Sequence, residues 1–179
     1  NFFMAYMKII ESTSTWTCPK TADYEIICVA GGQGGGATPV SNTHVQGGLG
    51  GATSFGSYLT ASGIWGESVI APNSGGMGGY TLHSYGGYGG SGLSSNISAP
   101  IGNGGTTKAT GLGYGAGGGS AADYYGGKCG RLKTTFVTIE KNTAVNCVVG
   151  TGGIGATGVA DSNKNGLNGV AGVIIIREV

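Results

Sequence analysis

Glycine is unevenly distributed along this chain, and that distribution restricts the folds open to it more than any other feature. It accounts for 41 of the 179 residues, yet residues 1–30, 131–149 and 173–179 contain none. Glycine loses more conformational freedom on folding than any other residue. Long glycine tracts therefore become ordered only where they pack together and are anchored, and the three glycine-free segments are the expected anchors.

The glycine-free segments have the composition of β-strands. Residues 24–30 form a β-branched and aromatic run that ends at the first glycine. Residues 134–140 and 145–149 are predicted to pair as a hairpin across the polar turn between them. Residues 173–179 are the most apolar strand candidate and are expected in the middle of a sheet. No apolar repeat of helical period extends beyond two turns, so the predicted fold class is all-β.

The expected architecture is a β-sandwich-like domain with long glycine-rich loops. Its strands are expected in four stretches, residues 13–30, 52–60, 132–149 and 170–179.

Glycine repeats with a period of three in two tracts, residues 75–80 and 86–92. This period matches a polyproline-II-type helix, which has three residues per turn and no internal hydrogen bonds. Glycine faces allow such helices to approach closely enough for the backbone of one to bond to the backbone of the next. We therefore expect the loops to pack as polyproline-II-type (polyglycine) helices at one end of the sandwich. Flexible, solvated glycine loops are the alternative.

Charge is scarce in this chain. Only 9% of the residues are charged, and the formal net charge is +1. This near-balance gives no electrostatic footprint for nucleic acid or for an anionic membrane surface. The chain also lacks the run of about 18 apolar residues that a membrane span needs. We therefore expect neither a nucleic-acid partner nor membrane insertion.

Motifs for catalysis or cofactor binding are missing. Residues 113–118 match Gly-x-Gly-x-x-Gly, but a chain this rich in glycine produces such matches by chance, and no strand and helix flank them. There is no phosphate-binding loop and no nucleophile elbow. The carboxylates are too sparse to locate a catalytic pair, so we expect no enzyme activity, cofactor or metal site. The carboxylates on or beside predicted strands, expected to face solvent, are Asp23, Glu25, Glu140 and Glu178.

The four cysteines are spaced too widely, and too far from histidine, for a zinc site. Buried free thiols, an incidental bridge and a bridge that staples two strands all remain open. The residues are Cys18, Cys28, Cys129 and Cys147.

Aromatic side chains lie within or beside the glycine runs, where little else can bury them. Rigid amphipathic rings supply contact area at a low entropic cost, which suits a recognition surface. The competing interpretation is that each ring packs on the glycine surface and holds it together. The candidate receptor-binding residues are Trp65, Tyr80, His83, Tyr85, Tyr88, Tyr114, Tyr124 and Tyr125.

The order of strands and glycine runs is itself a pattern. Thr15-Trp16-Thr17-Cys18-Pro19 and the run from Tyr24 to Gly36 give a strand, a proline, a second strand and a glycine run. Gly50-Gly51-Ala52-Thr53-Ser54-Phe55-Gly56 adds a short strand between glycines, and residues 150–155 and 168–176 close the pattern. This order resembles the glycine-rich domain of bacteriophage tail-fibre and receptor-binding (adhesin) proteins, with the Thr-Ser-Phe-Gly segment as the most specific match.

The resemblance implies a virion component at the distal end of a tail fibre or tail spike, where it contacts the host cell surface. It implies a homotrimer, joined to other tail-fibre subunits, that binds a bacterial surface receptor (a glycan or an outer-membrane protein) without enzymatic chemistry. Residues 13–179 form the glycine-rich β domain in this interpretation. Residues 1–12 match nothing in the family and are expected to be a stem or a strand, and their apolar Phe2-Phe3-Met4 favours association between copies.

Two other functions compete with host recognition. One is a structural glycine-rich trimerisation or spacer module of a virion fibre. The other is a carbohydrate-binding, lectin-like domain. Because the first residue is not methionine, the chain is expected to be a processed product or a part of a longer protein.

Overall fold

The structure, a computed structural model, describes residues 5–40, 43–64, 93, 110–119, 126–157 and 165–179. These residues form strands, turns and extended segments, and none of them lies in a helix, let alone one able to cross a lipid bilayer. For the described part of the chain, the prediction of an all-β fold is confirmed. The remaining residues lie outside the described part, and they include both tracts in which glycine has a period of three.

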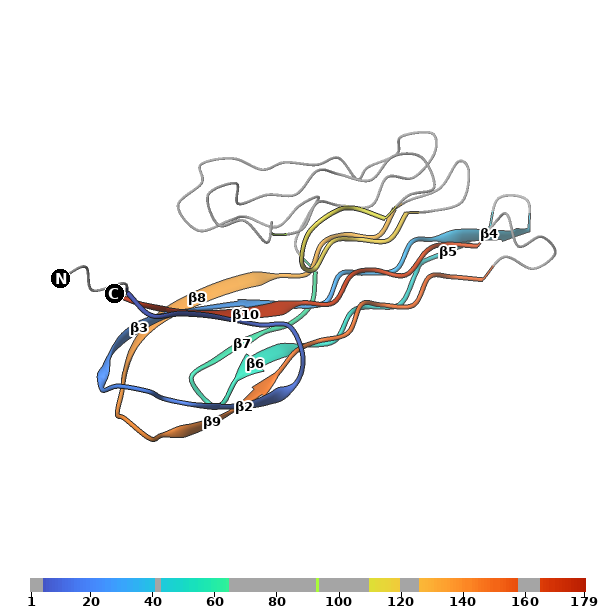
Figure 1. Ribbon diagram of the computed structural model, residues 1–179. Helices are drawn as coiled ribbons and strands as arrows, with labels where there is room; N and C mark the ends of the chain where they lie inside the picture. The colour runs from blue at the N-terminus through green and yellow to red at the C-terminus, as the bar shows by residue number, and fades with distance from the viewer. Residues whose placement is uncertain (1–4, 41–42, 65–92, 94–109, 120–125, 158–164) are drawn as a thin grey trace.

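Most strands belong to two antiparallel sheets of four strands each (Figure 1). The first sheet has the order β1 (Met7–Ile10), β10 (Val173–Glu178), β3 (Ala22–Val29), β8 (Leu132–Ile139). The second sheet has the order β2 (Ser14–Thr17), β9 (Ala144–Val148), β6 (Thr53–Phe55), β7 (Leu59–Ala61). A separate pair joins β4 (Ala37–Val40) to β5 (Thr43–Val45). As expected from its composition, β10 lies in the interior of its sheet.

The two four-stranded sheets share one hydrophobic core. Successive side chains of a strand point to opposite faces, which brings Tyr24 of β3 together with Trp16 of β2 and Phe55 of β6. The centroid of the Trp16 ring lies 5.6 Å from that of Tyr24 and 5.5 Å from that of Phe55. The Trp16 indole N–H donates to the Tyr6 hydroxyl over 2.9 Å. Full burial of each large apolar side chain contributes about 1.5–3 kcal/mol, so this cluster fixes the sheets against each other.

The predicted hairpin between residues 134–140 and 145–149 is wrong. Strand β8 pairs with β3 in the first sheet, whereas β9 pairs with β2 and β6 in the second. The turn between them is bound to Cys18, whose N–H donates to the Thr143 carbonyl and whose carbonyl accepts from the Asn142 N–H, both over 2.8 Å. Burial of β8 and β9 on opposite sides of one core therefore outweighs local pairing.

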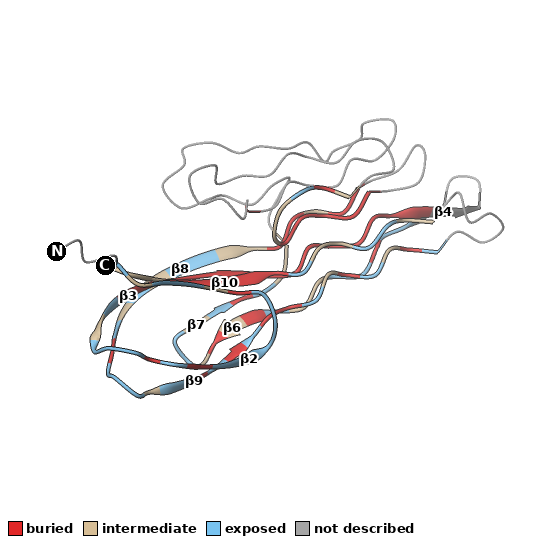
Figure 2. Cartoon of the chain, in the orientation of Figure 1, coloured by how far each residue is buried: buried red, intermediate tan, exposed pale blue. Residues whose placement is uncertain are grey.

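Glycine-rich segments extend from one end of the sheets and run side by side (Figure 1). Six of them are described: residues 31–36, 46–52, 111–119, 126–130, 150–157 and 165–172. The segment 31–36 is buried along its whole length (Figure 2). It makes hydrogen bonds with each of the five others, so it is the centre of this glycine bundle.

The backbone donors of this central segment change direction with a period of three residues. Gly31 and Gly34 donate to the segment 46–52, and Gly32 and Gly35 donate to the segment 165–172. The N–H of Gln33, between them, donates to the Lys128 carbonyl, and all five bonds span 2.8–2.9 Å.

The carbonyls of the central segment bond to the two remaining neighbours. Gly32 accepts from Gly153 and Gly35 accepts from Ala156, both in the segment 150–157. Gln33 accepts from Gly118 in the segment 111–119. Donated and accepted bonds therefore alternate around the central segment, which pairs its polar backbone groups without a sheet.

One side chain bridges the bundle. Gln33 is the sole non-glycine of residues 31–36, and only 8% of its surface is exposed. Its amide nitrogen donates to the Gly47 carbonyl over 3.3 Å, and its amide oxygen accepts from the Lys128 N–H over 3.2 Å. The side chain thus joins two outer segments across the centre.

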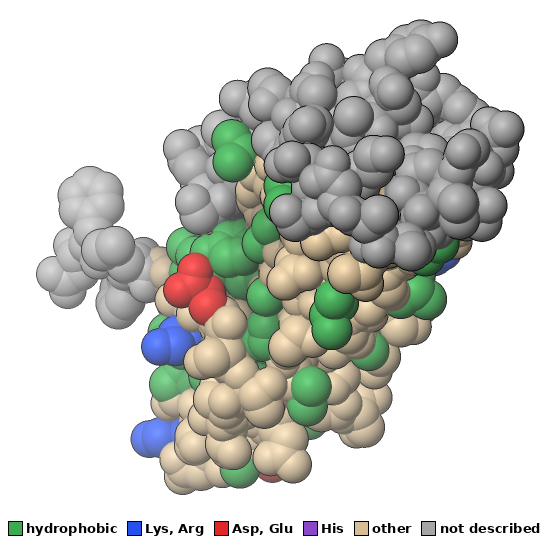
Figure 3. All heavy atoms as spheres, turned by 90° about the vertical axis from the view of Figure 1, so that its right-hand side faces the viewer, with side chains coloured by type: hydrophobic (Ala, Val, Ile, Leu, Met, Phe, Trp, Pro, Cys, Tyr) green, Lys and Arg blue, Asp and Glu red, His purple; other side chains and the backbone are tan. Residues whose placement is uncertain are grey.

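The segments approach too closely for side chains. A β-carbon on Gly32 would lie 1.9 Å from the Ala116 carbonyl oxygen, and one on Gly34 would lie 2.2 Å from that of Ile154. Viewed from this end, the described surface consists mainly of backbone and uncharged side chains (Figure 3). Glycine is therefore required here by the packing distance between backbones.

Candidate functional site

The aromatic residues predicted to bind a receptor fall almost wholly outside the described residues. Those outside are Trp65, Tyr80, His83, Tyr85, Tyr88, Tyr124 and Tyr125. Receptor binding by these seven residues therefore stays a prediction.

Tyr114 is the one described member of that set, and its contacts are internal. Its backbone pairs with Leu93, and its ring packs against a buried cluster on the outer side of the first sheet. Its hydroxyl donates to Glu11 Oε1 over 2.5 Å. Burial, followed by this hydrogen bond, raises the pKa of Tyr114 to about 12. These contacts support the packing interpretation for this ring.

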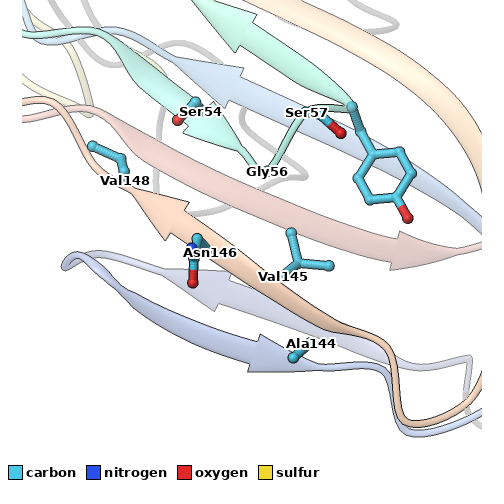
Figure 4. Close-up of a pocket in the computed structure, with 8 residues that line it drawn as sticks. Ser54, Gly56, Ser57, Ala144, Val145, Asn146 and Val148 are labelled. Atoms are coloured by element: carbon cyan, nitrogen blue, oxygen red, sulfur yellow. The ribbon is translucent and has the colours of Figure 1, made fainter.

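The described residues contain a groove on the outer face of the second sheet (Figure 4). Its volume is about 460 Å³. It is lined by Ser54, Gly56, Ser57, Tyr58, Ala144, Val145, Asn146 and Val148. These residues come from β6, from the turn after β6, and from β9.

Strand β9, in which exposed and buried side chains alternate, forms one wall of this β6–β9 groove. Ala144, Asn146 and Val148 are exposed, whereas Val145 and Cys147 point into the core. Strand β6 contributes Ser54, which pairs with Val148 in the register of the two strands. The pairing continues past the end of β6, where the Gly56 N–H donates to the Asn146 carbonyl over 2.7 Å.

The turn between β6 and β7 supplies the other wall. The Tyr58 N–H donates to the Phe55 carbonyl over 3.0 Å, and Gly56 has a φ of +49°. The Tyr58 ring lies 5.8 Å from the buried Phe55 ring and remains 39% exposed. A β-carbon on Gly56 would lie 2.9 Å from a methyl carbon of Val145. The hollow thus depends on glycine at this position.

Uncharged polar groups surround the groove. The lining contains three hydroxyl groups and one amide, and no Lys, Arg, Asp, Glu or His. No hydrogen bond joins the side chain of Ser54, Ser57, Tyr58 or Asn146 to another described residue. The neighbouring Thr53 differs, because its hydroxyl is buried and accepts from the Gly150 N–H over 2.9 Å.

Two ion pairs among the described residues lie on the first sheet or beside it. Arg177 and Glu25 face each other on β10 and β3, with Nη2 and Oε1 2.8 Å apart. Glu25 is only 6% exposed, so the expectation that it faces solvent is wrong; its partner offsets the cost of burial. Lys20 contacts Glu178 and, through a hydrogen bond, holds the pKa of that carboxyl below its ordinary value.

The four cysteines are buried and unbridged. Burial raises the pKa of the Cys28 thiol to about 12 and also raises that of Cys147. Protonated, buried thiols are poor nucleophiles and poor metal ligands. Within the described residues, no three His, Cys, Asp or Glu side chains are grouped so that they could hold a metal ion.

Comparison with models of protein families, with curated proteins and with solved structures finds no match. The function is therefore inferred from the contacts of the chain itself.

Proposed function

We propose that the chain is the receptor-recognition tip of a bacteriophage or phage-like tail fibre, a non-enzymatic adhesin. In this proposal the β-sandwich-like part is the anchor, and the glycine-rich segments are packed polyglycine helices of the polyproline-II type. The observation that carries the proposal is the three-residue period in the hydrogen bonds that residues 31–35 donate.

The period supports polyglycine helices for a geometric reason. A polyproline-II helix has three residues per turn, so the N–H groups of residues i and i+3 point in the same direction. Gly31 and Gly34 donate to one neighbour, and Gly32 and Gly35 donate to another. The close approach of Gly32 and Gly34 to neighbouring carbonyls is what such packing requires.

A bundle of this kind suits receptor recognition. Its interior is held by backbone bonds, so the loops that join its segments are free to carry side chains for binding. Functional residues are often found on loops positioned by a rigid scaffold. The residues proposed for receptor contact are Trp65, Tyr80, His83, Tyr85, Tyr88, Tyr114, Tyr124 and Tyr125, although the internal contacts of Tyr114 weaken its case.

The proposed assembly is a homotrimer within the virion, attached to other tail-fibre subunits. The outer face of the first sheet supports association, because Phe136 is 65% exposed and Met7 is 48% exposed. The register places Met7, Arg177, Glu25 and Phe136 in one row across that face. Exposed large apolar side chains that share one face are typical of a surface that is covered in an assembly.

Cell binding tests the proposal. The purified chain should adsorb to intact cells of some bacterial strains, and replacing Tyr80, Tyr85 and Tyr88 together with Ala should abolish adsorption while the protein still folds. Adsorption that survives the triple replacement would favour a different contact surface. Folded protein that adsorbs to none of a broad panel of strains would favour the spacer module.

The second candidate, a lectin-like domain, is favoured by one observation, the uncharged β6–β9 groove with an exposed tyrosine. It predicts saturable binding of a free sugar, which a spacer module does not.

A further inference from the structure

We infer that the β6–β9 groove is a binding site for a neutral glycan, with Tyr58 as the stacking platform and Asn146 and Ser54 as hydrogen-bonding groups. The site lies on the second sheet, and its lining includes none of the residues predicted for receptor contact. It stands whether or not the chain is a tail-fibre tip, because it rests on the groove alone.

The lining of the groove carries no charged side chain. The lining has hydroxyl and amide groups and no ionisable carboxylate, amine, guanidinium or imidazole. A charged ligand would enter without an opposite charge to offset the loss of its hydration. The groove therefore favours an uncharged ligand.

The groove offers both donors and acceptors of hydrogen bonds. A serine hydroxyl both donates and accepts, and an asparagine amide offers two donors and an acceptor. In the structure the side chains of Ser54, Ser57 and Asn146 have no described partner, although they line one concave site. Sugar hydroxyls also donate and accept, so a sugar offers the kinds of partner that these groups need.

The groove also contains an aromatic ring, that of Tyr58. Tyr58 is 39% exposed, and its position is fixed by the turn bond to Phe55 and by the ring contact at 5.8 Å. A ring held in place loses little entropy when a ligand stacks on it. The C–H face of a pyranose is apolar and flat enough to stack there, and Val148 adds exposed apolar surface to the groove.

The groove is large enough for a small ligand. A volume of about 460 Å³ lies within the usual range for small-ligand sites, about 300–1,000 Å³. Exposed threonines continue the polar strip on both sides, since Thr60 pairs with Ser54 and Thr15 pairs with Asn146. Residues directly opposite in a sheet share a face. A glycan longer than one residue would therefore find further hydroxyl partners.

Nuclear magnetic resonance titration of the intact, folded chain tests the site. The probes are glucose, galactose, mannose, N-acetylglucosamine and their β-linked disaccharides, with sialic acid as the charged comparison. At least one neutral sugar should shift the amide signals of Tyr58 and Asn146 saturably, and sialic acid should not.

Three variants locate the binding. Tyr58→Ala should weaken it at least tenfold, Tyr58→Phe should weaken it less than fivefold because the ring remains, and Asn146→Ala should weaken it severalfold. Thr134→Ala, at an exposed position on the first sheet, is the matched control and should leave it unchanged. If Tyr58→Ala fails to fold, the exposed Asn146 position still tests the site.

Three results would overturn the inference: no neutral sugar of the panel binds, the shifts map away from the groove, or sialic acid binds equally well. Adsorption of the chain to cells is measured separately. Adsorption that persists in Asn146→Ala together with no sugar binding would remove the glycan site and leave the proposed adhesin function in place.

Discussion

A β-carbon on Gly32 would lie 1.9 Å from the carbonyl oxygen of Ala116. The two residues belong to different glycine-rich segments, 31–36 and 111–119, and the contact is backbone against backbone. Neither side can yield without breaking hydrogen bonds that hold the bundle. Because this approach is so close, the packing of the bundle can be tested by measuring how substitutions of Gly32 change the free energy of unfolding.

Replacing Gly32 with Ala should destabilise the fold by at least about 3 kcal/mol, since overpacking a rigid site usually costs 1–3 kcal/mol and more where backbone must move. Urea unfolding followed by tryptophan fluorescence measures the change. Gly48→Ala is the matched control, because the nearest atoms to its β-carbon are 3.5 Å away, and its cost should stay within about 0.5 kcal/mol. Equal effects of the two variants would contradict the packed bundle.

Replacing Gln33 with Leu should cost about 2–3 kcal/mol. The variant loses two hydrogen bonds and leaves the Gly47 carbonyl and the Lys128 N–H without this partner, and a buried group left unpaired costs about 1–3 kcal/mol. Hydrogen exchange at Lys128 should quicken in the variant. The exposed Gln46 provides the comparison, and Gln46→Leu should change neither stability nor exchange. Unchanged exchange at Lys128 in Gln33→Leu would show that the bridge contributes nothing.

Stability should fall as the pH rises from about 9 to about 12. The pKa of Cys28 is raised to about 12 in the folded chain, from an ordinary value of 9.0. Between these values the unfolded chain releases a proton that the folded chain retains, so unfolding becomes easier by about 1.4 kcal/mol per pH unit for each such thiol. The contribution of the protonated Cys28 thiol to stability is fully present below pH 9 and is lost as the pH rises towards 12.

Cys28→Ala is the test of that pH dependence. The variant should be less stable than the parent chain at every pH, because it leaves a cavity, but its free energy of unfolding should decline less steeply above pH 9. If the free energy of unfolding declined equally steeply with pH in both proteins, groups other than Cys28 would cause the loss of stability at high pH. The native thiols should also resist an aromatic disulfide reagent at pH 8 until denaturant is added.

The chain should be a trimer at micromolar concentration, and Phe136→Glu should shift it towards monomer, because a charge would replace the most exposed ring of the proposed interface. Light scattering during size-exclusion chromatography measures the mass. Ile154→Glu changes a residue that is 74% exposed on a glycine-rich segment and should remain trimeric. A monodisperse monomer of the unmodified chain would contradict the proposed assembly.

Local sequence predicted the strands well and their partners poorly. The apolar runs that became β3 and β10 are recognisable because burial on both faces demands apolar side chains throughout. The partners of β8 and β9 depend on the core that both strands share. No local sequence pattern predicts how that core is assembled. The same reason hid the β6–β9 groove, since Ser54 and Asn146 meet through a register between distant segments.

The glycine period was visible in the sequence, although at other places than those the structure describes. The tracts at 75–80 and 86–92 repeat glycine strictly, whereas the described network centres on Gly31-Gly32-Gln33-Gly34-Gly35. In this segment the direction of the N–H hydrogen bonds repeats every three residues. The glycine sequence does not repeat in the same way, because Gln33 interrupts it. The role of Gln33 in joining two segments follows from their arrangement in space and has no signal in the sequence.

The arrangement of the bundle has a mechanical consequence. Its segments run away from the sheets (Figure 1), and its hydrogen bonds cross between them at successive points along residues 31–35. A force that pulls the far end of the bundle away from the sheets loads these bonds in shear, so several must rupture together. A force that separates the N-terminal β1 from the C-terminal β10 instead opens their pairing one residue at a time. The chain is therefore stiff towards a load at its glycine end and weak towards one that separates its termini.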